Sequence, residues 1–277
     1  MCYYTTVLKN NPADKEDLKM KKILAMILAA AMVFALCACG QSSAPAATEA
    51  PAATEAATEA PAAEEKSAGD LVYAVEAGSA GEAVALENGW NVVSVDTQSK
   101  ALMEVAAGTS DAAIIDLLMA GAMIGEGTSY PDMKLGDELT TEEYGVGCRK
   151  GSDLADFINS VFAETYADGT MLEIAKTYGV QESLVEQPAV EEVTYADDGD
   201  VAYIKDKGTL IVGITDFEPM DYKDENGEWI GFDADMAKAF AESLGVSVEF
   251  VEIDWDNKIL ELGSKSIDCV WNGMTLT

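Results

Sequence analysis

Side chains that can bind a small polar molecule follow three apolar segments near the carboxyl end of the sequence. Phe217 and Trp255 come directly after two of these segments, and Gly273 and Thr275 lie at the end of the third. An aromatic ring offers a flat apolar wall, while a carbonyl and a hydroxyl can hydrogen-bond the backbone of an amino acid. Isolated aromatic residues are more often part of a core. Their places directly after strands favour a binding pocket.

The strands and helices that would carry these side chains alternate along residues 208–277. Residues 209–214, 246–251 and 267–271 are short, apolar and rich in β-branched residues, which is typical of buried strands. Asp233 can cap a helix that has acidic residues in its first turn and ends before Gly245. This alternation predicts a parallel α/β sheet, and such sheets bind ligands beyond the carboxyl ends of their strands.

Two further candidate positions lie earlier in the sequence. Ser79 and Ala80 stand in a glycine-rich turn from a strand into a helix, where free N–H groups favour an anion such as a carboxylate. Asp116 ends a strand over 111–116, where its carboxylate can pair with an ammonium group. From the residues alone each has a plainer explanation, because the first can be only a turn and Asp116 can cap the helix over 117–124.

Composition excludes several classes of protein. The chain has 17 basic and 50 acidic residues and a formal net charge of −33, whereas binding to nucleic acid or anionic lipid needs basic patches. It has no histidine, which excludes Ser-His-Asp catalysis and histidine-ligated metal sites. It also lacks P-loop and dinucleotide fingerprints, and its adjacent carboxylates lie in polar stretches, so we expect no buried acid pair. We therefore predict no catalytic residues, cofactor, metal or enzymatic activity.

The first 69 residues have the pattern of an exported and anchored protein. Met20 begins a basic and then apolar stretch typical of a secretory signal, which ends in a box resembling that of bacterial lipoproteins. We expect a signal peptide over 20–38, lipidation such as palmitate at Cys39, and a disordered Ala/Pro/Thr/Glu tether over 39–69. The alternative is an uncleaved membrane anchor. Residues 1–19 are expected to be an upstream extension that contributes nothing to the fold.

Two parts of the sequence resemble one known family. Residues 201–277 contain GTLIVGITDFEPMDY, NGEWIGFDADMAKAFAESLGV, EIDWDNKILEL and DCVWNGMTLT, and they resemble the N-terminal part of the family 3 extracellular solute-binding proteins. Residues 70–183 contain VEAGSAGEA, SDAAIID, EEYGVGCRKGSDL and ADGTMLEIAKTYG, and they resemble the C-terminal part. The resemblance implies an α/β periplasmic-binding-protein-like (type 2) fold of two lobes with parallel-rich sheets flanked by helices, with the two parts in permuted order.

The resemblance also implies an assignment of the segments and of the site. The segments are 70–147 for lobe 2, 148–183 for the C-terminal helices of lobe 1, 184–200 for a permutation linker and 201–277 for the N-terminal part of lobe 1. Carboxylate-facing amides would lie at Ser79 and Ala80, and Asp116 would bind the amine. We expect lobe 2 to be incomplete, because one strand and a carboxylate-clamping arginine of relatives have no counterpart and the only arginine is Arg149.

These observations predict an extracytoplasmic solute-binding receptor, held at the membrane only by its lipid anchor, that delivers a polar amino acid to the permease of an ABC transporter. We expect a monomer with no nucleic-acid partner. The alternatives are a truncated or permuted fragment that binds nothing, and a dehydratase-like enzyme on the same fold. The sequence leaves open whether Cys148 and Cys269 form a disulfide, because nothing in it fixes their distance.

Overall fold

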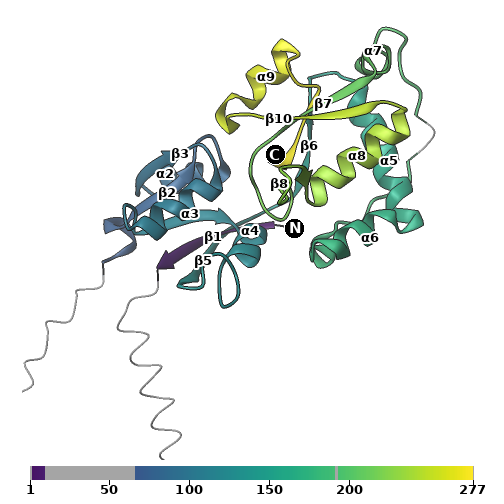
Figure 1. The fold of residues 1–277 in the computed structure, drawn as a ribbon. Helices are drawn as coiled ribbons and strands as arrows, with labels where there is room; N and C mark the ends of the chain where they lie inside the picture. The colour runs from purple at the N-terminus through teal and green to yellow at the C-terminus, as the bar shows by residue number, and fades with distance from the viewer. Residues whose placement is uncertain (1, 10–65, 191–192, 277) are drawn as a thin grey trace, which may run out of the picture. The chain divides into compact units, whose positions relative to one another are not determined.

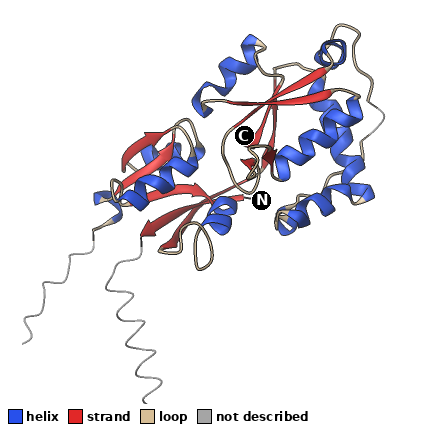
Figure 2. Cartoon of the chain, viewed as in Figure 1, coloured by secondary structure: helices blue, strands red, loops and turns tan. Residues whose placement is uncertain are grey.

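The computed structural model describes residues 2–9, 66–190 and 193–276, which form two β-sheets and a short hairpin. Helices and strands alternate along most of this part of the chain (Figure 1, Figure 2). The predicted α/β class, with parallel-rich sheets flanked by helices, is confirmed. Cys39, the expected signal peptide and most of the expected tether lie outside the described residues. Within them, no helix is both long and apolar enough to cross a membrane.

The first sheet has five strands in the order β3-β2-β4-β1-β5. The strands are β1 (Cys2–Lys9), β2 (Val72–Glu76), β3 (Asn91–Val95), β4 (Ala112–Asp116) and β5 (Met133–Glu142). The accompanying helices are η1 (Ala68–Asp70), α2 (Ala80–Glu87), α3 (Gln98–Ala107) and α4 (Leu117–Met123). β2 pairs in parallel with β3 and β4, whereas β1 runs antiparallel to β4 and β5.

Strand β1 corrects the expectation that residues 1–19 contribute nothing to the fold. It lies inside the sheet, with Tyr4 opposite Asp116 and Leu8 opposite Ala112 in the backbone register, and it pairs with β5 along its other edge. An interior strand is hydrogen-bonded on both sides, so residues 2–9 are part of this sheet. The Tyr, Thr and Val content of 2–9 favours a strand. We did not predict one because the segment that follows is polar and residues 1–19 were interpreted together.

The second sheet has four strands in the order β10-β7-β11-β6. The strands are β6 (Tyr144–Cys148), β7 (Thr209–Ile214), β10 (Ser247–Glu252) and β11 (Cys269–Thr275), and the hairpin is β8 (Tyr222–Lys223) with β9 (Trp229–Ile230). The helices are α5 (Leu154–Asp168), α6 (Thr170–Thr177), η2 (Gln181–Ser183), α7 (Asp200–Lys207), α8 (Phe232–Leu244), η3 (Trp255–Asn257) and α9 (Lys258–Ser264). β7 pairs in parallel with β10 and β11, whereas β6 is antiparallel to β11.

Helix α8 confirms the apolar face expected from its sequence. The buried residues on this face are Met236, Ala237, Phe240, Ala241 and Leu244. They pack in one core with side chains of β7 and β11, and Gly245 ends the helix with a φ of 73°. The start of the helix differs from the prediction, because its N-cap position is Gly231 and not Asp233. Gly231 has a φ of 125°, and a Cβ there would lie 2.1 Å from the carbonyl oxygen of Met220.

Candidate functional site

Polar side chains from both sheets gather where the parallel strands end. We call this group the strand-end cluster. Its members are Glu76, Gln98, Asp116, Thr215, Lys258 and Asn272. Glu76 and Asp116 are the last residues of β2 and β4, and Thr215 follows β7 directly. The cluster therefore lies at the sheet edge where the sequence predicted a ligand.

Asp116 stands at the N-cap position of α4, but its side chain is held by Gln98. Its carboxyl is 1% exposed, and its Oδ2 accepts a hydrogen bond from Gln98 Nε2. Its backbone N–H donates to Gln98 Oε1 over 2.8 Å, and its side chain makes no capping bond to α4. The position expected by the capping explanation is therefore confirmed, but the side chain does not act as a cap, and the carboxylate is held by Gln98 at the carboxyl end of β4.

Glu76 forms a buried acid pair with Asp116, which corrects the expectation of no such pair. Glu76 is 4% exposed, and among the described residues its Oε1 has no hydrogen-bond partner. Burial, and to a lesser extent the charge of Asp116, raise the pKa of Glu76 to about 8. Hydrogen bonds from Gln98 and Thr215 and the charge of Lys258 act in the opposite direction. The cluster thus holds two acids and one ammonium in a poorly solvated place.

Asn272 joins the ends of β7 and β11 on the other side of the cluster. Its Oδ1 accepts a hydrogen bond from the Thr215 backbone N–H, and its Nδ2 donates to Thr215 Oγ1 over 3.0 Å. Both residues are buried. These two bonds fix the Thr215 hydroxyl beside Glu76, so neither Thr215 nor Asn272 rotates freely at this edge.

Lys258 connects Trp255 with the turn that contains Ser79, and both of these residues were predicted to bind the ligand. Its Nζ donates to the carbonyl oxygens of Gly78 and Trp255, each over 3.0 Å, and lies 4.5 Å from the centroid of the Trp255 ring. Trp255 is 6% exposed and packs in a small core with Ile253 and Leu262. Its ring is therefore covered by an ammonium group, as a cation–π pair, and is not an open wall.

The Ser79 turn caps a helix in this structure. Ser79 Oγ accepts a hydrogen bond from the Glu82 backbone N–H over 3.1 Å, and Ala80 is the first residue of α2. Gly78 has a φ of 72°, and a Cβ there would lie 2.9 Å from the Cα of Asp256. The close approach of η3 to this turn therefore requires glycine.

Phe217, Gly273 and Thr275 take part in packing and in internal hydrogen bonds. Phe217 is 2% exposed, and a Cβ at Gly273 would lie 2.7 Å from its ring. The Gly273 backbone N–H donates to Asp233 Oδ2 over 3.3 Å, and Thr275 Oγ1 donates to Glu142 Oε2. The structure thus brings Phe217 and Gly273 together, and it buries the aromatic wall that we expected to face a ligand.

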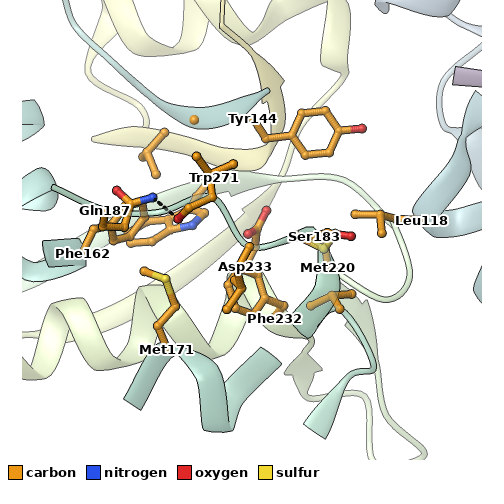
Figure 3. Close-up of a pocket in the computed structure, with 15 residues that line it drawn as sticks. Leu118, Tyr144, Phe162, Met171, Ser183, Gln187, Met220, Phe232, Asp233 and Trp271 are labelled. Atoms are coloured by element: carbon orange, nitrogen blue, oxygen red, sulfur yellow. Dashed lines mark hydrogen bonds between the residues drawn. The ribbon is translucent and has the colours of Figure 1, made fainter. Parts of the chain in front are cut away.

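A second buried acid pair, Asp221 and Asp233, lies beside Gly273. Burial raises the pKa of both carboxyls, that of Asp233 to about 7, and the charge of Asp233 raises that of Asp221 further. Neither carboxylate oxygen of Asp221 has a hydrogen-bond partner within the described part of the chain. Asp233 lines a mainly apolar cavity of about 110 Å³, in which its carboxyl points toward the space between Trp271 and Tyr144 (Figure 3). None of the predicted ligand residues lines this cavity, and ligand pockets are usually several times larger.

A larger hollow of about 280 Å³ has acidic and aromatic walls. Its lining residues are Ser99, Met123, Asp216, Glu218, Tyr222, Lys223, Trp229 and Glu252. Lys223 Nζ lies 3.0 Å from Glu252 and 4.6 Å from the centroid of the Trp229 ring. Burial and the charge of Asp216 raise the pKa of Glu218. A cation in this hollow would meet carboxylates and the faces of aromatic rings.

Arg149 has a structural role away from the strand-end cluster. Its Nε lies 3.0 Å from Asp200 Oδ2, its guanidinium lies 3.6 Å from Asp268 Oδ1, and it donates to the Ile267 carbonyl over 2.8 Å. Lys207 contacts the same Asp268, at 2.6 Å. Arg149 thus ties the end of β6 to α7 and β11. Over the described ranges, no group of His, Cys, Asp and Glu residues is arranged to hold a metal ion.

Residues 210–277 match the family model of the bacterial extracellular solute-binding proteins, family 3. This range contains most of β7 and all of α8, β10 and β11, and it contributes Thr215, Lys258 and Asn272 to the strand-end cluster. The predicted resemblance of 201–277 to family 3 is confirmed.

Relatives of known name share this similarity over part of their length. The L-cystine-binding protein TcyJ of Escherichia coli (strain K12) is 33% identical over 85 residues, which is 30% of this chain and 32% of TcyJ. The arginine-binding extracellular protein ArtP of Bacillus subtilis (strain 168) is 40% identical over 72 residues, 26% of this chain and 28% of ArtP. A solved ancestral cationic amino acid solute-binding protein is 47% identical over 28% of this chain and 34% of its own, with a TM-score of 0.27. The chain therefore spans about a third of the length of the relatives that it matches.

Sequence reasoning missed Glu76, Gln98 and Lys258. Glu76 carries the signal that led to Asp116, since it is an acid at the carboxyl end of a strand. Gln98 and Lys258 belong to the first turns of helices, where a polar residue is ordinarily solvated, so no local pattern marks them.

Proposed function

We propose that the chain is an extracytoplasmic solute-binding receptor that binds a polar amino acid and delivers it to an ABC importer. The strand-end cluster carries this proposal, because Glu76 and Asp116 place two buried acids beside hydrogen-bonding groups from the other sheet. A carboxylate in such a place gains a charge-assisted hydrogen bond from the α-ammonium group of an amino acid. The family 3 match and the amino-acid-binding relatives support the same class of ligand.

The hollow beside Trp229 favours a cationic side chain on that amino acid. It has three carboxylates, from Asp216, Glu218 and Glu252, against one lysine that is already paired. The Lys223 ammonium shows how a cation sits there, on the face of an aromatic ring and next to a carboxylate. The name of one relative, an arginine-binding extracellular protein, agrees with this choice.

A thermal-shift screen of the purified protein against the common amino acids tests this function. A ligand present at 100 times its dissociation constant stabilises the folded state by about 2.7 kcal/mol. We expect the largest shift from arginine or lysine and no shift from acidic amino acids. Absence of a shift with every amino acid would contradict the receptor function and favour the non-binding fragment.

Lipid anchoring at Cys39 is part of the proposal and has its own test. The Cys39→Ala protein should leave the membrane fraction and lose labelling by a fatty-acid probe, whereas Cys148→Ala should retain both. Unchanged fractionation and labelling of the Cys39→Ala protein would contradict the anchor.

Dehydratase activity is a second candidate, favoured by the buried Glu76. A carboxyl with a pKa of about 8 is mostly protonated at neutral pH and can act as a general acid. The cyclohexadienyl dehydratase of Pseudomonas aeruginosa is 35% identical over 74 residues, 26% of this chain and 28% of that enzyme. Turnover of a cyclohexadienyl substrate by the wild-type protein that is lost in Glu76→Gln would support dehydratase activity. Absence of turnover by the wild-type protein would contradict dehydratase activity and favour the receptor function.

A further inference from the structure

Two cysteines lie directly opposite each other in the second sheet. In the antiparallel pairing of β6 with β11, Cys148 is the register partner of Cys269, and Gly147 is the partner of Val270. Both cysteines are free thiols in this structure. Residues opposite each other on antiparallel strands have Cα atoms about 4.5 to 5.5 Å apart and side chains on one face. A disulfide needs a Cα separation of about 4.4 to 6.8 Å, so the backbone already satisfies this requirement.

The strand that carries Cys148 can make the small adjustment that a bond requires. β6 is an edge strand, and β11 is its one neighbour in the sheet. β11 already packs closely on it, because a Cβ at Gly147 would lie 2.3 Å from the Met274 sulfur. Directly opposite Cβ atoms lie about 4.5 to 5.5 Å apart, and a disulfide brings them to roughly 3.5 to 4.5 Å. If the edge strand moves by about one ångström, the two Cβ atoms reach the separation that a disulfide requires.

We propose that Cys148 and Cys269 form a disulfide that joins β6 to β11 when the chain meets a small-molecule disulfide such as oxidised glutathione. The Cys148 thiolate attacks one sulfur of the oxidant, forms a mixed disulfide and releases one thiol. The Cys269 sulfur then attacks the Cys148 sulfur of that mixed disulfide and releases the second thiol. Two protein thiols are oxidised and one external disulfide is reduced to two thiols.

The order of the two steps follows from exposure. Cys148 is partly exposed, whereas Cys269 is fully buried. Burial raises the pKa of Cys148 to about 12 and also raises that of Cys269. For Cys148 the charge of Arg149 opposes this effect and that of Asp200 reinforces it. For Cys269 the groups that oppose it are Arg149 and Lys207, and those that reinforce it are Cys148 and Asp268.

These environments make the bond form faster during folding than after it. Because thiolate is the reactive species, a thiol buried at the β6–β11 junction reacts slowly with an oxidant. In the unfolded chain both thiols are solvated and have ordinary reactivity. The oxidising space that would supply the disulfide is that of the proposed extracytoplasmic location, so the occurrence of the bond in cells rests on the proposed function.

The test is oxidative refolding of the full chain, followed by peptide mapping without reductant. We expect most molecules that refold with oxidised glutathione to carry the peptide of Cys148 linked to that of Cys269. We also expect the link to form at least tenfold faster on refolding than when the oxidant is added to folded, reduced protein. A Cys269→Ser chain should give no link at Cys148.

The outcome does not depend on the folding of the variant, because the wild-type chain is scored directly. Thiols of Cys148 and Cys269 that stay reduced after oxidative refolding, or that link to Cys2, Cys37 or Cys39 instead, would overturn the proposal. A bond that forms efficiently in the test tube but is absent in cells would count against the extracytoplasmic location and not against the bond.

Discussion

Asp221 and Asp233 lie next to each other in the turn after β7 and at the start of α8, where burial raises the pKa of both. In the unfolded chain each titrates near its ordinary pKa, about 3.9. Between about pH 4 and pH 7 the folded state therefore binds more protons than the unfolded state. The free energy of unfolding should fall as pH rises through this window.

Asp233→Asn tests this pH dependence. Removing one acid of the pair should flatten the decrease, so that the variant gains stability relative to wild type between pH 4 and pH 8, by an amount on the order of a few kcal/mol. The Lys238 charge, which lowers the pKa of Asp221, remains in the variant. Urea denaturation at each pH gives the measurement, and Asp156→Asn, an exposed aspartate of α5, is the control. Parallel curves for wild type and Asp233→Asn would contradict the account.

Single residues also show how far sequence reasoning reached. Asp116 was correctly placed at the end of a strand and Trp255 shortly after one, because short apolar segments fix where a strand ends. The ammonium group of Lys258, three residues later, lies over the Trp255 ring. The short helix η3 between them sets this contact, and no sequence pattern predicts its geometry. The partner of Asp116, Gln98, comes from the start of a different helix, so only the folded chain brings them together.

Among the secondary-structure elements, β1 has the largest effect that the sequence did not predict. Deleting residues 2–9 should leave β4 and β5 without their shared partner, and backbone groups on both strands should become accessible to water. Hydrogen exchange should then accelerate at the amides of Ile114 and Ile115 in β4. The amides of β7 in the second sheet are the internal control and should keep their protection. Unchanged protection of β4 after the deletion would show that β1 does not hold this sheet together.

The ends of β6, α7 and β11 meet at Arg149, which gives a second prediction for the elements. Among the described residues, Arg149→Met would leave Asp200, with a side chain 12% exposed, and Asp268, fully buried, with lysines as their charged partners. Removing one partner of a buried ion pair typically costs about 3 kcal/mol or more. Urea denaturation should show this loss, whereas the exposed neighbour substitution Lys150→Met should have little effect. Equal losses for both variants would refute the structural role.

The elements that could be predicted are those with a strong local period and clear boundaries. β7, β10, β11 and α8 were found because their apolar patterns and glycine ends agree. Helix α7 lies between the expected linker and the first predicted strand of 201–277, where we predicted no helix. Only two of its residues, Val201 and Ile204, are buried, and the acidic and basic residues around them leave no clear apolar pattern. Tertiary packing, which the local pattern does not record, decides such segments.

At the scale of the whole molecule, the strand-end cluster combines residues from opposite ends of the folded sequence. Glu76, Gln98 and Asp116 come from the first sheet and its helices, and Thr215, Lys258 and Asn272 come from 215–272. The family 3 match covers only the second group. The proposal that both groups serve one ligand is therefore the central claim, and the permuted order of the segments is part of it.

Calorimetric titration of the wild-type and Asp116→Asn proteins with the amino acid that gives the largest thermal shift tests that claim most directly. Asp206→Asn, which changes an exposed aspartate of α7, is the matched control. A charge-assisted hydrogen bond contributes about 1.5 to 3 kcal/mol, so affinity should fall by roughly tenfold to more than a hundredfold in Asp116→Asn and stay unchanged in the control. Wild-type affinity in Asp116→Asn would contradict the assignment of the strand-end cluster as the site of amino-acid binding.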